Sequence, residues 1–160
     1  MCKKIGKYLT YKEVIKSSTA IRKGIKNIPD KKQLYHIKLW YNHIFKPVRE
    51  FINNSLGCNS IFRCIELNEV IGGSNTSQHC ALKGAAGDID CDKYHHGTNK
   101  DIFNFIRCTL DFDQLIWEFG TKNKPDWVHV SYNKGHNRHQ ILVSYKDKNN
   151  KTKYKNYATI

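Results

Sequence analysis

Two segments of the sequence carry histidine and carboxylate side chains at spacings that suit metal binding. In the first, His79 is followed by a passage of small residues, 84–87, and then by Asp88 and Asp90. Small residues let a backbone pass close to a bound group, and residues two apart in a strand project from one face. We therefore expect a loop histidine followed by a strand with both aspartates on one face.

The second segment places His129 within an apolar run that is typical of a strand, Trp127–Tyr132. Asp126 precedes this histidine by three residues. Strand alternation alone would put the two side chains on opposite faces. Both can meet one site only if Asp126 lies on the turn made by Pro125.

Together these side chains are of the types that a catalytic zinc site requires. Such a zinc takes three protein ligands from histidine and carboxylate and leaves its fourth position to water. The metal lowers the pKa of water, and a nearby carboxylate that does not bind the metal takes the proton. Each histidine–aspartate pair alone would also fit a surface pair or a hydrogen-bonded core group. The other histidines lack ligand companions or lie in polar segments, and we expect them to be packing, surface or substrate-rim residues: His36, His43, His95, His96, His136 and His139.

The elements that must position these groups divide the chain in two. Residues 11–24 read as a helix, and Asp30 can cap a long second helix that Pro47 should kink or interrupt and that should end at residues 56–57. From Cys58 onward, short apolar runs alternate with glycine, asparagine and serine clusters. This part predicts strands at 60–64, 87–91, 114–119, 127–132 and 140–145, and helices at 66–71 and 101–110. Helices followed by an antiparallel sheet predict an α+β domain.

Length and composition fit a single domain, residues 1–160, with a basic polar tail at 146–160 that forms a solvated end or a weak edge strand. Basic residues number 27 against 14 acidic ones, a net charge of +13. Such a charge attracts polyanions: nucleic acid, an anionic membrane surface or the anionic polymers of a bacterial envelope. Because lysine far outnumbers arginine, we do not expect specific nucleic-acid recognition.

Other features of the sequence bear on the compartment. No stretch approaches the roughly 20 apolar residues of a membrane span. The basic start lacks the apolar stretch of a secretory signal, so we expect synthesis in the cytoplasm. Six cysteines without a CxxC pair predict free, mostly buried thiols in a reducing compartment.

The two segments with candidate metal ligands together resemble the M15 family of zinc peptidases. The resemblance is carried by Ser77-x-His79, then Gly84-x-Ala86-x-Asp88, then Trp127-Val128-His129. It extends over about residues 9–143 and looks closest to short phage- and prophage-type members. The family includes D-Ala-D-Ala carboxypeptidases and dipeptidases, and phage L-alanyl-D-glutamate endopeptidases.

The resemblance implies residue roles and a fold. His79, Asp88 and His129 would be the zinc ligands, and Asp126 the general base. Arg63 would face a substrate carboxylate or the developing oxyanion, unless it forms a structural salt bridge, and Ser77 would orient the site or a substrate group. The implied fold is the M15/hedgehog-like α+β fold, with N-terminal helices packed on a small antiparallel sheet.

One departure concerns the loop after His79. The family usually has two residues between this histidine and the glycine, whereas this chain has four, residues 80–83. A two-residue bulge is the simplest account. It leaves Asp90 as a competitor of Asp88 for the metal, because both lie on one strand face.

These observations predict a zinc-dependent peptidoglycan peptidase, a hydrolase of cell-wall degradation. The leading expectation is a phage or prophage endolysin-type L-alanyl-D-glutamate endopeptidase; the alternative cleavage is that of a D-Ala-D-Ala carboxypeptidase. Its partners would be stem peptides and anionic wall polymers, and we expect a monomer that acts at the wall after release or on a virion. Two other classes remain open: a catalytically inactive wall-binding or virion structural module, and a basic nucleic-acid-binding domain.

Overall fold

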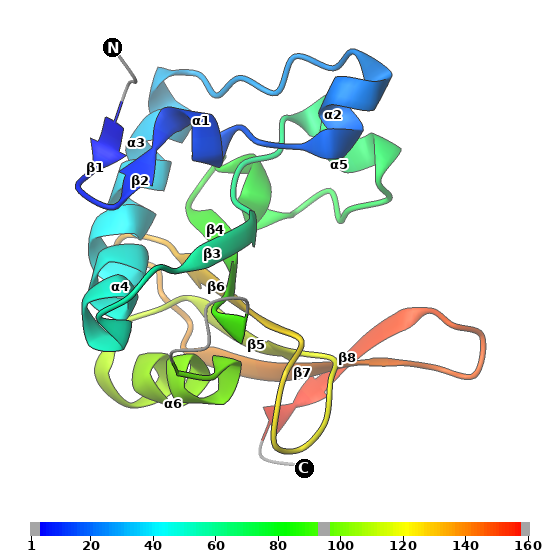
Figure 1. The fold of residues 1–160 in the computed structure, drawn as a ribbon. Coiled ribbons are helices and arrows are strands. Elements are labelled where there is room, and N and C mark those ends of the chain that lie inside the picture. The colour runs from blue at the N-terminus through cyan, green and yellow to red at the C-terminus, as the bar shows by residue number, and fades with distance from the viewer. Residues whose placement is uncertain (1–3, 93–96, 158–160) are drawn as a thin grey trace.

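The computed structural model describes residues 4–92 and 97–157, and Figure 1 shows their α+β fold. Cys2, His95 and His96 lie outside the described residues. The elements are β1 (Lys4–Gly6), β2 (Leu9–Thr10), α1 (Tyr11–Val14), α2 (Ser18–Lys23), α3 (Lys31–Trp40), the π-helix η1 (Tyr41–Phe45), α4 (Lys46–Ile52), β3 (Gly57–Ser60), α5 (Ile65–Val70), the 3-10 turn η2 (Gln78–Cys80), β4 (Ala85–Asp90), α6 (Asn99–Thr109), β5 (Gln114–Glu118), β6 (Trp127–Tyr132), β7 (Gln140–Lys146) and β8 (Thr152–Asn156).

The main sheet has six strands in the order β3-β4-β6-β5-β7-β8, and β1 with β2 forms a small separate antiparallel pair. The expected α+β class is confirmed, but the expectation of a purely antiparallel sheet is wrong, because β5 and β7 pair in parallel. The physical reason lies in the chain path. β6 runs antiparallel to β5, and the connection 133–139 reverses the chain again, so that β7 reaches the free side of β5 in the direction of β5.

The two faces of this sheet have different roles. Ile89, Val130 and Leu115 project from one face, are fully buried and pack under α3, η1 and α6. Alternation places Asp88 and His129 on the opposite face, where both line a cavity. The sheet therefore has a core side and a functional side.

The N-terminal helices differ in detail from the sequence expectation. The predicted helix at 11–24 is two short helices, since Ser17 caps the start of α2 and Gly24 ends it in the left-handed region (φ 68°). Asp30 caps α3 as expected, through a capping box with Gln33. Ahead of Pro47 the α-helix is interrupted by the wider π-helix η1, as expected, which accommodates the backbone hydrogen bond that proline cannot donate.

Trp40, at the end of α3, joins the helices to the functional strands. Its side chain is fully buried, and its Nε1 donates a hydrogen bond to the carbonyl of Val130 at 3.0 Å. A Cβ atom at Gly87 would lie 2.3 Å from Cζ2 of the indole, so the ring rests where only glycine leaves room. This contact fixes α3 against β4 and β6, the strands that carry Asp88 and His129.

Two further sequence expectations concern thiols and membranes. The five described cysteines are free; Cys80 and Cys91 are buried, Cys58 and Cys64 are half-buried, and Cys108 is exposed. Within residues 4–92 and 97–157, no helix has the length and apolar character needed to cross a membrane.

Candidate metal centre and cleft

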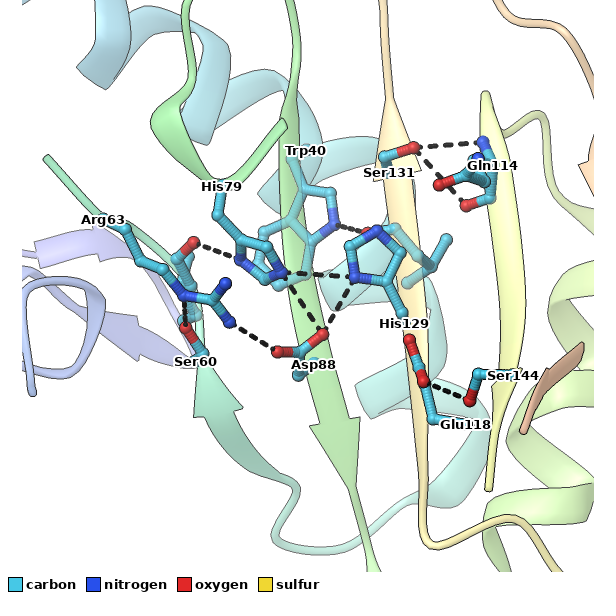
Figure 2. A network of polar contacts seen from close by, with 12 residues as sticks. Trp40, Ser60, Arg63, His79, Asp88, Gln114, Glu118, His129, Ser131 and Ser144 are labelled. Atoms are coloured by element: carbon cyan, nitrogen blue, oxygen red, sulfur yellow. Dashed lines mark hydrogen bonds and ion pairs between the residues drawn. The ribbon is translucent and has the colours of Figure 1, made fainter. Parts of the chain in front are cut away.

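Three side chains from three different elements converge on the functional side of the sheet. Asp88 on β4 lies directly opposite His129 on β6, and His79 reaches them from η2 (Figure 2). His79 Nε2 lies 3.2 Å from His129 Nδ1 and 3.3 Å from Asp88 Oδ1, and His129 Nδ1 lies 2.9 Å from the same oxygen. The structure thus brings the three sequence-predicted ligands together in one cluster that could hold a metal ion.

The spacing of these atoms fits a tetrahedral zinc. With zinc–nitrogen and zinc–oxygen bonds of about 2.0–2.1 Å, neighbouring ligand atoms of a tetrahedron lie about 3.3 Å apart. The three observed separations run from 2.9 to 3.3 Å. Two imidazoles and one carboxylate also form the donor set that catalytic zinc sites use, with one position left open.

Neighbouring groups orient two of the three potential ligands, His79 and Asp88. Nδ1 of His79 is 2.9 Å from the carbonyl of Ile61, so it donates there, and Nε2 faces the cluster. Arg63 donates from Nε to Ser60 Oγ at 2.9 Å and from Nη2 to Asp88 Oδ2 at 3.1 Å. Arg63 thereby occupies the second carboxylate oxygen and leaves Oδ1 to face the histidines.

The electrostatics of Asp88 favour its ionised form. Burial raises the pKa of this carboxyl group, but the charges and hydrogen bonds of His79 and His129 outweigh burial and hold the pKa far below its usual value. The side chain therefore carries its negative charge at neutral pH, as a metal ligand must.

The loop with the two extra residues is held by α3 and leaves the cluster intact. Gln33 Nε2 donates to the carbonyl of Cys80 at 3.0 Å, and His36 Nδ1 donates to the carbonyl of Ala81 at 2.7 Å. Ala81 itself takes a left-handed conformation with φ 53°, which closes the bulge. The extra length is therefore absorbed in the loop before β4 begins.

Asp90, the competing aspartate, makes different contacts. Its carboxylate accepts hydrogen bonds from Asn99 Nδ2 at 3.2 Å, from the Asp92 backbone at 3.1 Å and from Asn59 Nδ2 at 3.4 Å. These contacts tie β4 to β3 and to the start of α6. Asp90 is thus engaged in the scaffold beside the cluster, while Asp88 faces the histidines.

The cluster opens into a polar cavity of about 570 Å³. Arg63 and Ser77, both singled out from the sequence, line this cavity, together with Arg138. Asp126 is placed differently: its side chain is exposed at the start of β6 and is not among the described residues that line the cavity. Its backbone groups instead bond to the carbonyl of Glu118 and to the Asn99 side chain.

Glu118 is a cleft residue that the sequence analysis missed. It ends β5, is only 7% exposed, and lines the cavity. Ser144 Oγ on β7 donates to Glu118 Oε2 at 2.5 Å (Figure 2). Burial raises the pKa of Glu118, and the Ser144 hydrogen bond and the charge of His129 only partly oppose this rise. Strand alternation could have indicated that residue 118 shares a face with residue 116, but the pairing of β5 with β6 was needed to place it near His129.

The segment at 140–156 contributes a further wall that was not expected. β7 and β8 form a hairpin that projects from the body of the molecule (Figure 1), which makes part of the basic tail an edge strand. Thr152 and Tyr154 of β8 line the cavity together with Leu142 of β7. Tyr154 is 52% exposed, and the partial burial of its phenol raises the pKa, as do the charges of Glu118 and Asp88.

Comparison with known proteins identifies the family to which this chain belongs. The model of the family described as Peptidase M15 matches residues 7–131, a range that includes all three residues of the cluster. No curated protein matches the chain. The chain belongs to the Peptidase M15 family, and it is therefore a peptidase. The matched range ends within β6, so the β7–β8 hairpin lies beyond it.

Proposed function

We propose that this chain is a zinc-dependent peptidase that cuts the stem peptide of bacterial peptidoglycan, as an endolysin-type L-alanyl-D-glutamate endopeptidase of phage or prophage origin. The observation that carries the zinc proposal is the cluster of His79, Asp88 and His129, whose ligand atoms lie 2.9–3.3 Å apart in an M15 chain. Membership of this peptidase family supports the substrate class. The net charge of +13 supports action near the anionic polymers of the wall.

The residues of the cluster and of the cavity wall would have separate roles in hydrolysis. His79 Nε2, His129 Nδ1 and Asp88 Oδ1 would hold the zinc. When bound, zinc lowers the pKa of water and polarises the peptide carbonyl. Arg63 keeps Asp88 Oδ2 occupied and so fixes the carboxylate in place. Ser77 on the cavity wall can accept or donate a hydrogen bond to the bound peptide.

An internal cut is favoured over removal of a terminal D-alanine because of its effect on the wall. Breaking the bond between L-alanine and D-glutamate opens the cross-linked wall, whereas removal of terminal D-alanine only trims it. The cavity also has two guanidinium groups on its wall, Arg63 and Arg138, which suit any substrate with a carboxylate, whether on D-glutamate or on a terminal D-alanine. Both guanidiniums already pair with aspartates, so they add attraction without setting the cleavage site by themselves.

Mass spectrometry of digested muropeptides tests the cleavage. The zinc-loaded protein is expected to release fragments that end at L-alanine and begin at D-glutamate. Free D-alanine with an intact L-alanyl–D-glutamate bond would instead identify a D-Ala-D-Ala carboxypeptidase. Wall binding without any product would identify an inactive module and would contradict the proposed activity.

Replacing Arg63 with alanine is expected to weaken zinc binding by about 10–100-fold, the usual effect of losing a group that orients a metal ligand. Asp88 Oδ2 would lose its partner and the carboxylate could rotate. Chelator competition measures the zinc affinity, and Arg63→Lys is the matched control that keeps the charge but cannot bond Ser60 and Asp88 as a fork. If Arg63 served only a substrate carboxylate, as the family resemblance allows, zinc affinity would stay unchanged and only KM would rise.

A further inference from the structure

The cavity differs in character on the two sides of the metal cluster. Figure 2 shows Arg63 on one side of the cluster and Glu118 on the other. On the first side Arg63 bonds to Asp88 and brings a guanidinium group to the cavity wall. On the second side the sheet continues through β5 and β7, whose buried residues Ile116 and Leu142 line the cavity. The cleft thus has a cation on one side of the cluster and an apolar floor on the other.

The register of the sheet places this floor directly beside the cluster. Ile116 lies opposite His129, and Leu142 lies opposite Ile116, so the three residues form one row across the sheet. Neighbouring strands are about 4.8 Å apart, and an extended peptide advances about 3.3–3.6 Å per residue. A peptide that crosses the strands from the cluster therefore places the one or two residues next to the scissile bond over this floor.

Tyr154 on β8 forms the far wall of the same side. It pairs with Ser144, and alternation puts both on the face that carries Leu142. Tyr154 lines the cavity. Partial burial raises the pKa of its phenol, and so do the charges of Glu118 and Asp88 across the cleft. The side chain therefore leans from the edge strand toward the cluster.

The fold itself makes little use of the Tyr154 side chain. Within residues 4–92 and 97–157, no hydrogen bond engages its hydroxyl group and no aromatic ring packs against it, and it is about half exposed. Such a phenol can contact a bound peptide through the face of the ring and through a hydrogen bond. The family match ends at residue 131, before this strand begins, so membership of the family assigns Tyr154 no role.

We propose that Ile116, Leu142 and Tyr154 form a substrate subsite that takes a small apolar side chain, the methyl group of the alanine next to the scissile bond. The Tyr154 hydroxyl donates a hydrogen bond to the backbone of the bound peptide. This inference rests on the proposed peptidase function and deepens it. D-glutamate, on the other side of the bond, then lies toward the cationic side of the cleft. A larger apolar side chain meets the Tyr154 ring, so the wall selects by size as well as by polarity.

Kinetics of matched tyrosine variants test the hydrogen bond. Tyr154→Phe removes the hydroxyl group alone and is expected to raise KM for a synthetic stem peptide about 3–10-fold, the usual effect of one hydrogen bond. Zinc content and kcat are expected to stay unchanged, because this contact serves binding. Tyr145→Phe makes the same change on the opposite face of the hairpin and is expected to keep the wild-type KM. A wild-type KM in Tyr154→Phe would overturn the hydrogen bond.

Substrate size gives a readout that a merely structural role would not move. The wild type is expected to cut the stem peptide ~10-fold or more efficiently than an analogue with L-leucine in place of L-alanine. Tyr154→Ala opens the wall and is expected to remove most of this preference, whereas Tyr145→Ala is expected to keep it. A general defect would instead lower kcat/KM for both peptides by the same factor. An unchanged preference in Tyr154→Ala would overturn the subsite.

Binding to the zinc-free protein separates this inference from the proposed function. By calorimetry, the uncleaved stem peptide is expected to bind Tyr154→Ala more weakly than Tyr145→Ala. If the wild type cuts the stem peptide while Tyr154→Ala keeps both affinity and preference, the subsite is wrong and the proposed function stands. If the zinc-loaded wild type neither cuts nor binds the stem peptide, the proposed function fails and the subsite fails with it.

Discussion

Asp88→Ala is expected to abolish zinc retention and, with it, peptidase activity. The substitution removes the anionic member of the cluster and leaves two imidazoles, with His79 Nε2 3.2 Å from His129 Nδ1. It also frees the Arg63 guanidinium, which then stands beside the site as an unpaired positive charge that repels a cation. We expect the zinc affinity to fall by more than the ~10²-fold that loss of an orienting residue causes. Metal analysis after gel filtration, followed by chelator competition, measures this loss.

The matched substitution Asp90→Ala is expected to retain one zinc per chain. It removes hydrogen bonds to Asn99 and to the Asp92 backbone, so some stability should be lost without loss of the metal. Circular dichroism of both variants shows whether each still folds. If Asp90→Ala released the zinc and Asp88→Ala kept it, the four-residue loop would have shifted the strand register, and the ligand assignment would be wrong.

Trp40→Ala is expected to lower the free energy of unfolding by about 3–5 kcal/mol, the usual cost of truncating a buried aromatic side chain to alanine. The indole is fully buried and bonded to the Val130 carbonyl, and it covers Gly87, so its loss leaves both a cavity and an unpaired carbonyl. Urea denaturation followed by circular dichroism measures the change. The control Trp40→Phe keeps an aromatic ring and should lose less. A loss below about 1 kcal/mol in Trp40→Ala would show that the helix layer does not depend on this contact.

Much of the fold follows from local patterns in the sequence. β6 has the bounds that its alternating run predicts, and α6 begins and ends close to its predicted range. Asp30 caps the start of α3 as the sequence predicts, and the structure adds a capping box with Gln33. Such features depend on neighbouring residues only, which is why a single sequence can indicate them.

The features that the sequence did not indicate depend on residues far apart in the chain. Parallel pairing of β5 with β7 follows from the path of the chain around β6, which no local pattern encodes. The four-residue loop after His79 keeps its shape through Gln33 and His36, more than forty residues upstream. Glu118 resembles any polar residue at a strand end until the register sets it diagonal to His129.

The candidate site also combines features that the sequence indicates with features that depend on how distant strands pack together. The chemistry of His79, Asp88 and His129 could be expected from residue types and a family motif, and the structure brings these three together. Which carboxylate serves as base depends on the direction of side chains on neighbouring strands. The spacing of residues in a motif does not give that direction. Asp126 is near His129 in the chain, and Glu118 is near it in the sheet. Of these two residues, Glu118 lines the cavity and Asp126 does not.

The outer strand of the β7–β8 hairpin, β8, forms part of the cavity wall without being part of the buried core. The residues that shape the cleft there are therefore different from the residues that hold the fold and the cluster together. β4 and β6 are almost wholly buried, so a substitution there disturbs the core or the cluster. β8 is exposed along its whole length, yet Thr152 and Tyr154 still form part of the cavity wall. Exposed positions tolerate substitution at little cost to folding. Substitutions in β8 can therefore change the outline of the cleft at little cost to folding, whereas substitutions in β4 and β6 would disturb the core or the cluster.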